Sequence, residues 1–140
     1  MSTKENNYTA IATAKGGRSG QVKTTDGVLD LKVSVPVEFG GQENGYTNPE
    51  QLFAAGWAAC FDNAVIMVAK NKKIEVDSTT TVEVTLGAQE GGSVGLSAII
   101  KVKIDNLPAK EAKKIITAAH RVCPYSKATK GNINVEIIQL

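Results

Sequence analysis

Alternation of apolar and polar positions predicts six strands: three before residue 36, two within 82–104 and one near the end of the sequence. The segment 29–35 alternates most clearly, with apolar side chains at every second position from Leu29 to Val35. Glycine-rich turns separate the alternating segments, as at 16–20 and 90–93. On this pattern we expect strands over 8–15, 21–25, 29–35, 82–86, 96–104 and 133–137.

A long helix is predicted between the first three strands and the rest. Asn48 and Pro49 suit the capping and first positions of a helix, which we expect to run to about Asn71. The segment 52–61 is apolar on every side of such a helix, so we expect it to lie in the centre of the core or in a subunit interface. Three small residues in it would let another backbone approach: Gly56, Ala58 and Ala59.

A second helix is predicted to open at 106–108 and to end near Cys123 and Pro124, because proline cannot continue the helical hydrogen bonds. Its inward face is expected to carry Ala112, Ile115, Ile116 and Ala119, with Lys110, Lys113 and Lys114 outward. The elements follow the order of three strands, a helix, two strands, a helix and a strand. With hairpins joining most neighbouring strands, this order predicts an α+β fold with mainly antiparallel sheets, formed by one domain over residues 1–140.

Composition narrows the classes of function. The chain has 140 residues, 42% hydrophobic and 21% charged, with a net charge of +2, which is typical of a globular domain. There is no basic stripe with interleaved aromatic residues, so we expect no nucleic acid partner. The polar start 1–7 lacks a signal-peptide core, and the apolar run 52–61 is too short to span a membrane. We therefore expect a cytoplasmic protein with no membrane partner, in a compartment that keeps thiols reduced.

Two cysteines are the first candidates for chemistry. In a reducing compartment, Cys60 and Cys123 are either inert core residues or reactive thiols, and their types alone leave both open. Cys123 lies at a helix end, where it could move toward another sulfur more easily than a residue in the middle of a helix. Their spacing matches neither a CxxC redox motif nor a zinc site, and His120 has no ligand partners at metal spacing, so we expect no metal. We place His120 on a helix surface.

Two charged residues could act on a thiol. Arg18 lies among glycines that allow a sharp turn, and it is either an ordinary exposed turn residue or a cation that stabilises a thiolate and binds peroxide oxygens. Glu50 either interacts with the helix dipole or orients Arg18 through a salt bridge. It lies ten residues before Cys60, which is about 15 Å along one helix, so it cannot touch that sulfur directly. This separation favours a site shared between two subunits.

Three stretches of the sequence resemble the organic hydroperoxide resistance (Ohr) family within the wider Ohr/OsmC superfamily. They are Ala14-Lys15-Gly16-Gly17-Arg18-Ser19-Gly20, then 47–61 with the sequence TNPEQLFAAGWAACF, and Val122-Cys123-Pro124-Tyr125-Ser126 followed by Gly131-Asn132. The resemblance covers essentially the whole chain.

The resemblance implies an OsmC-like fold, in which sheets surround a long central buried helix, and an intertwined homodimer. It implies a thiol-dependent peroxidase with Cys60 as the peroxidatic and Cys123 as the resolving cysteine, and with Arg18 and Glu50 activating Cys60. The implied substrates are alkyl and fatty-acid hydroperoxides. The implied reductant is a dithiol such as a lipoylated protein, with no bound cofactor. Two alternatives stay open: a broader OsmC-type peroxidase, and a redox-sensing module whose cysteine pair reacts once.

Overall fold

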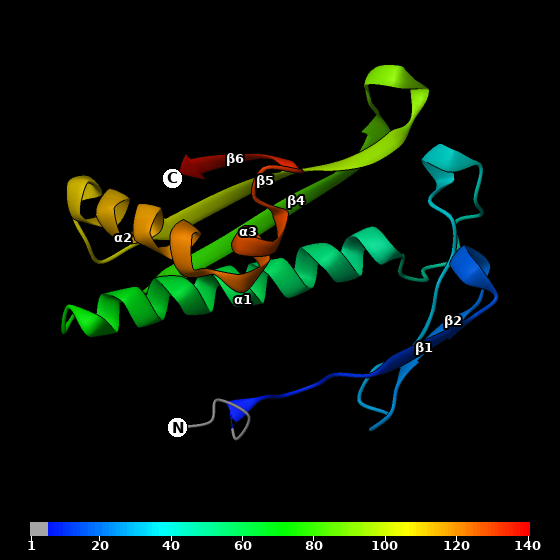
Figure 1. Cartoon of the computed structure of the whole chain (residues 1–140), viewed down its shortest axis with the longest axis horizontal. Coiled ribbons are helices and arrows are strands. Elements are labelled where there is room, and N and C mark those ends of the chain that lie inside the picture. Colours follow the sequence, from blue (N-terminus) through cyan, green and yellow to red (C-terminus); the bar gives the residue numbers. More distant parts are fainter. Residues whose placement is uncertain (1–5) are drawn as a thin grey trace. The chain divides into compact units, whose positions relative to one another are not determined.

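The chain divides into two units between Pro49 and Glu50. The computed structural model describes residues 6–140 (Figure 1), so the first five residues of the polar start lie outside the described residues. The single domain expected from the sequence remains a prediction.

The N-terminal unit is built on a small antiparallel sheet. Its strands lie in the order β1-β2-β3 and span Ala12–Lys15, Gln21–Thr24 and Asp30–Lys32. The turn between β1 and β2 needs glycine, because Gly16 has a φ of 84° and a Cβ on Gly20 would overlap the carbonyl of Lys15. The third strand is shorter than the expected 29–35, and Val33 instead forms an isolated parallel bridge with Thr47.

The C-terminal unit contains the remaining elements, beginning with the long helix α1 over Pro49–Asn71. The others are β4 (Ser78–Ala88), β5 (Val94–Ile104), α2 (Ala109–Val122), α3 (Pro124–Thr129) and β6 (Asn134–Gln139). The strands form one sheet in the order β4-β5-β6, with β4 and β5 antiparallel and β5 and β6 parallel. The expected α+β class with a long helix is therefore confirmed. The parallel pair arises because α2 and α3 carry the chain back to the start of the sheet, as a parallel connection requires.

The core of the C-terminal unit lies between β5 and the helices. Alternate residues of β5 from Ala98 to Ile104 face this core, as the period of two in a strand requires. Figure 1 shows α1 running along the sheet, and Trp57, Phe61 and Val65 bring one side of it into the same cluster. The inward face of α2 joins them through the four residues that its sequence pattern predicted: Ala112, Ile115, Ile116 and Ala119.

The other side of α1 is apolar and exposed. Ile66 is 42% and Met67 46% exposed, and Ala55 and Ala59 also face outward. By length and composition alone α1 could cross a membrane, and 28% of the stretch concerned is buried within the chain. Asp62 ends the uncharged run 52–61, and for this reason the sequence alone predicts no membrane-spanning helix. Burial of α1 on all sides is therefore not achieved within one chain.

Candidate active site

Cys60 lies on the side of α1 that packs against α3. Phe53, Gly56, Trp57 and Cys60 follow the i, i+3, i+4, i+7 spacing that puts residues on one face of a helix. Cys60 is half-buried in this face, whereas Trp57 is fully buried. The helix thus holds the sulfur at the margin of the core with one side accessible.

Cys123 lies at the junction of α2 and α3, and it is completely buried. Its backbone is held from both sides: its N–H donates to the Ala119 carbonyl at 2.8 Å and its carbonyl accepts from Lys127 N–H at 2.9 Å. Its thiol is near enough to that of Cys60 to raise the pKa of Cys60, and both residues belong to the same packed cluster. The sequence argument gave Cys123 mobility to reach Cys60. In the structure the two side chains already lie close together in the packed unit, so the proposed approach needs no large rearrangement.

The short helix α3 carries the contacts that keep Cys123 against Cys60. The Trp57 indole N–H donates to the buried Ser126 hydroxyl over a long hydrogen bond of 3.4 Å. The Tyr125 ring stacks on Trp57 with centroids 6.4 Å apart and lies 5.9 Å from the ring of Phe53. The Thr129 hydroxyl donates to the Tyr125 carbonyl of the same helix at 2.9 Å. These aromatic and polar contacts fix α3 on α1.

The surroundings of Cys60 within this unit favour the neutral thiol. Burial raises the pKa of Cys60, the backbone N–H of Tyr125 lowers it by hydrogen bonding, and the adjacent Cys123 thiol raises it again. The net pKa is above the ordinary value. Because the thiolate is the nucleophile, these surroundings keep Cys60 in the protonated thiol form, which is less reactive.

Arg18 and Glu50 fall in different units. Arg18 lies in the exposed 3₁₀ turn Gly17–Ser19 of the N-terminal unit, between glycines that permit the turn. Glu50 is in the first turn of α1, and the helix runs without a break to Cys60. The structure thus confirms that Glu50 and Cys60 are separated by about 15 Å of continuous helix. It brings Cys60 and Cys123 together and describes Arg18 only within its own unit.

Aromatic side chains around Cys60 divide into core and accessible residues. Trp57 and Phe61 are fully buried, so they belong to the core. Phe53 and Tyr125 are only half-buried beside the sulfur, and Leu52 is half-buried on the same helix. Of these apolar residues, Phe53, Tyr125 and Leu52 have surface left that an alkyl chain could contact.

His120 is not the surface residue that the sequence predicted. Its ring is half-buried, 6.3 Å from the Phe61 ring, and its Nδ1 is buried with no hydrogen-bond partner among the described residues. Burial first, and then the charge of Lys130, lowers its pKa below 6.5. The ring lies one turn before Cys123 and packs against Phe61, and we assign it no part in the chemistry.

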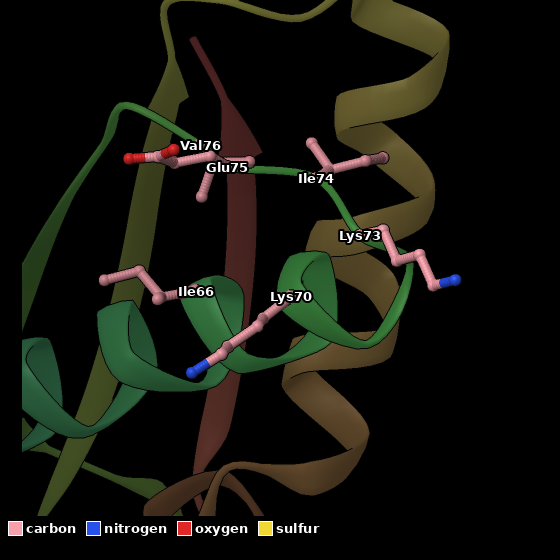
Figure 2. Close-up of a pocket in the computed structure, with 6 residues that line it drawn as sticks. All are labelled: Ile66, Lys70, Lys73, Ile74, Glu75 and Val76. Carbon is pink, nitrogen blue, oxygen red and sulfur yellow. The ribbon is translucent and has the colours of Figure 1, made fainter.

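A cavity of about 440 Å³ lies at the end of α1, away from the cysteines. Its lining includes Ile66, Ile74 and Val76, with Lys70 and Lys73 at its edge (Figure 2). Figure 2 shows the two lysine side chains pointing away from each other, so they do not converge on a shared anion site. The cavity is an apolar hollow continuous with the exposed side of α1.

Comparison with known proteins assigns the family. The model of the family described as "OsmC-like protein" matches residues 40–138. OhrB of Bacillus subtilis, an organic hydroperoxide resistance protein, is 44% identical over 133 residues, which are 93% of this chain and 96% of that protein. An organic hydroperoxide resistance protein of Xanthomonas axonopodis is 42% identical over 131 residues, covering 93% of this chain and 92% of that protein.

A solved structure agrees with these matches. The structure of an organic hydroperoxide resistance protein from Legionella pneumophila superposes with a TM-score of 0.89 at 47% identity, covering 94% of this chain and 96% of that one. This chain belongs to the OsmC-like family. Within it, the chain resembles the organic hydroperoxide resistance proteins over nearly its full length, which confirms the family resemblance noted in the sequence.

Sequence reasoning missed the helix that completes the site. Residues 124–129 were not predicted as a helix, and Ser126 and the Tyr125 backbone were not singled out. Six residues are too few to show helical periodicity. The one available signal was Pro124, which suits the first turn of a new helix as well as the end of the old one.

The buried His120 should make stability depend on pH. Because its folded pKa lies below its unfolded value, the unfolded state binds more protons as the pH falls through about 6.5. The free energy of unfolding should therefore decrease below that pH, until the folded-state pKa is passed. His120→Gln should lack this component. Urea unfolding of the wild type and of His120→Gln between pH 5 and 8 measures this component. The difference between their free energies of unfolding should change across this range, and a difference that does not depend on pH contradicts the lowered pKa of His120.

Proposed function

We propose that this protein is a thiol-dependent peroxidase that reduces organic hydroperoxides to alcohols. The observation that carries the proposal is that Cys60 and Cys123 lie close together in the cluster formed by α1 and α3. Relatives named for organic hydroperoxide resistance, at 42–44% identity over nearly the whole chain, support the substrate class. The proposed cellular location is the cytoplasm, where thiols are regenerated by reduction.

The Cys60 thiolate is the attacking group because its side chain is the accessible member of the pair. It attacks one oxygen of the O–O bond, the bond breaks, and the alkoxide leaves and takes a proton to become an alcohol. Cys60 is left as a sulfenic acid. The Cys123 thiol then attacks this sulfur, water leaves, and the Cys60–Cys123 disulfide forms. Adjacency of the two sulfurs makes this step fast relative to further oxidation of Cys60.

The disulfide is reopened by an external dithiol. Cys123 is fully buried and Cys60 is not, so the incoming thiolate attacks Cys60 and releases Cys123. The second thiol of the same molecule then displaces Cys60, which restores both cysteines and leaves the reductant as a disulfide. A lipoylated protein is the proposed donor, on the family resemblance.

An alkyl group on the substrate gives binding energy that hydrogen peroxide lacks. Half-buried Leu52, Phe53 and Tyr125 offer apolar surface beside the sulfur. Each buried CH₂ contributes about 0.8 kcal/mol, so several methylene groups are enough to favour a long-chain hydroperoxide by orders of magnitude.

Arg18 is the proposed source of the positive charge that Cys60 lacks within its own unit. A fixed guanidinium beside the sulfur favours the thiolate and donates to the leaving oxygen as negative charge develops there. Glu50 is proposed to orient this guanidinium through a two-point salt bridge.

A homodimer is the proposed assembly. The N-terminal unit exposes apolar side chains, among them Tyr8, Val28 and Phe39. The outward side of α1 is likewise apolar, and the edge strand β4 is 11 residues long. Uncovered surfaces and edges of this kind mark association sites. A second copy of the chain would cover them and complete the burial of α1.

Loss of either cysteine should have distinct effects on catalysis. With excess dithiol, the wild type should consume many equivalents of cumene hydroperoxide, and Cys60→Ser should consume none above the uncatalysed rate. Cys123→Ser should keep the first oxidation but lose sustained turnover, because the sulfenic acid oxidises further. Consumption of a single equivalent by the wild type contradicts the peroxidase and favours the redox-sensing alternative.

Removal of the Arg18 charge should raise the pKa of Cys60. We expect Arg18→Met to raise it by about 1–3, the range found for a side chain that loses an adjacent opposite charge. Peroxidase activity at pH 7 should fall by a similar factor of ten to a thousand and recover partly at higher pH. The pH dependence of Cys60 alkylation measures the pKa directly. Lys23→Met, on the same sheet, is the matched control, and an equal pKa in the two variants contradicts the role of Arg18.

Charge on the exposed side of α1 should prevent dimerisation. Sedimentation should give the wild type twice the 14.8 kDa mass of one chain. The double variant Ile66→Glu, Met67→Glu should sediment as a monomer, because buried unpaired carboxylates oppose association. Lys114→Glu on the exposed face of α2 is the control. A fully active wild-type monomer contradicts the proposed homodimer. Recovery of the protein only from the membrane fraction would identify α1 as a membrane-spanning helix.

A further inference from the structure

Gly56 is an unexpected residue for its position. It lies in the interior of α1, where glycine is less favourable than alanine because it orders a flexible backbone without adding packing. Its φ is not positive, so the helical conformation does not itself require glycine. The sequence suggested that small residues here admit another backbone. The structure shows a side chain of the same chain in that place.

The Tyr125 hydroxyl occupies the space where a side chain at position 56 would lie. A Cβ on Gly56 would be 2.5 Å from the hydroxyl oxygen and 3.2 Å from the ring carbon that bears it. Real Cβ contacts do not reach the first distance, and the second is tight. The close approach depends mainly on one atom, the hydroxyl oxygen.

Tyr125 connects this contact to both sulfurs. Its backbone N–H is near enough to Cys60, one turn along α1 from Gly56, to lower the pKa of that thiol. It is two residues from Cys123, on the first turn of the helix that begins there. Its ring lies against Trp57 and Phe53. A displacement of the ring away from α1 would therefore move the backbone N–H near Cys60 and the thiol of Cys123 together.

We propose that Gly56 and Tyr125 are positioning residues that set the approach of Cys123 to Cys60, and with it the stability of the disulfide. The absence of a Cβ at position 56 lets the tyrosine hydroxyl lie against the backbone of α1, and the tyrosine holds the start of α3 at the distance at which the sulfurs meet. The importance of this contact for catalysis rests on the proposed peroxidase. Its effect on the disulfide does not.

The test measures the equilibrium constant of the Cys60–Cys123 disulfide in glutathione buffers, without hydroperoxide. Gly56→Ala should lower this constant roughly tenfold to a hundredfold, the effect expected from overpacking a tight contact. Gly56→Ala with Tyr125→Phe should return it to within about threefold of the wild type, because the phenylalanine lacks the overlapping oxygen. Gly87→Ala is the matched control, since a Cβ there meets only the Thr85 methyl at 3.9 Å.

A second readout follows the same variants with hydroperoxide. Trapping with dimedone should capture more Cys60 sulfenic acid in Gly56→Ala than in the wild type, and the double variant should reverse this. A defect of Gly56→Ala that did not arise from the contact with Tyr125 would not be repaired by removing the tyrosine hydroxyl oxygen. The equilibrium constant of the disulfide can be measured whether or not the wild type turns over hydroperoxide. Failure of the proposed peroxidase and failure of this inference are therefore distinguishable.

An unchanged disulfide constant in Gly56→Ala overturns the proposal, as does a lowered constant that Tyr125→Phe does not restore. If Gly56→Ala is insoluble alone and soluble with Tyr125→Phe, the rescue supports the contact. Tyr125→Leu keeps the test decisive if both Gly56 variants fail to fold. Loss of the ring over Gly56 should lower the constant at least fivefold, and an unchanged constant in this variant overturns the proposal.

Discussion

The packing of the short helix α3 on one face of α1 determines the chemistry available to this protein. A six-residue helix has little stability of its own, so its place depends on the neighbouring aromatic rings and on the Trp57–Ser126 hydrogen bond. Because Cys123 begins this helix and Cys60 lies on the facing stripe of α1, the packing brings the two thiols close together. Two cysteines 63 positions apart in the sequence are thus neighbours in the fold.

Burial has opposite consequences for the two steps of the proposed reaction. It keeps the sulfurs adjacent and Cys123 protected, which favours the disulfide. It also raises the pKa of Cys60, which disfavours the thiolate that starts the reaction. A cation that approaches Cys60 resolves this conflict, and Arg18 is the proposed group. Burial also bears on the uncovered apolar surfaces. In a chain without a second copy beside it, the apolar outward side of α1 would remain in contact with water.

Much of this architecture follows from local patterns in the sequence. Asn48-Pro49 and the apolar run after it fixed the start and type of α1, and the inward and outward faces of α2 were predicted residue by residue. The parallel pairing of β6 was not predicted, since alternation gives a strand but not its partner. The shortness of β3 also escaped, because the apolar alternation continues beyond the last residue that pairs.

The two cysteines of the candidate site could be singled out from the sequence, but the residues that hold them together could not. A long-range thiol contact leaves no spacing signal, so the pairing of Cys60 with Cys123 came from the family resemblance and only the structure places the sulfurs together. The role of Gly56 was read as room for another backbone, because a sequence cannot show that a tyrosine 69 positions later fills that room. His120 was assigned to the surface because a lone histidine carries no pattern of burial.

The most direct test of the central claim is peptide mapping after one equivalent of cumene hydroperoxide is added to the fully reduced protein, followed by an acid quench. An equal mixture of ¹⁵N-labelled and unlabelled protein shows whether a disulfide joins residues of one chain. The account predicts a Cys60–Cys123 disulfide whose two peptides always carry the same label. Two free thiols, an over-oxidised Cys60, or disulfides of mixed label would contradict it.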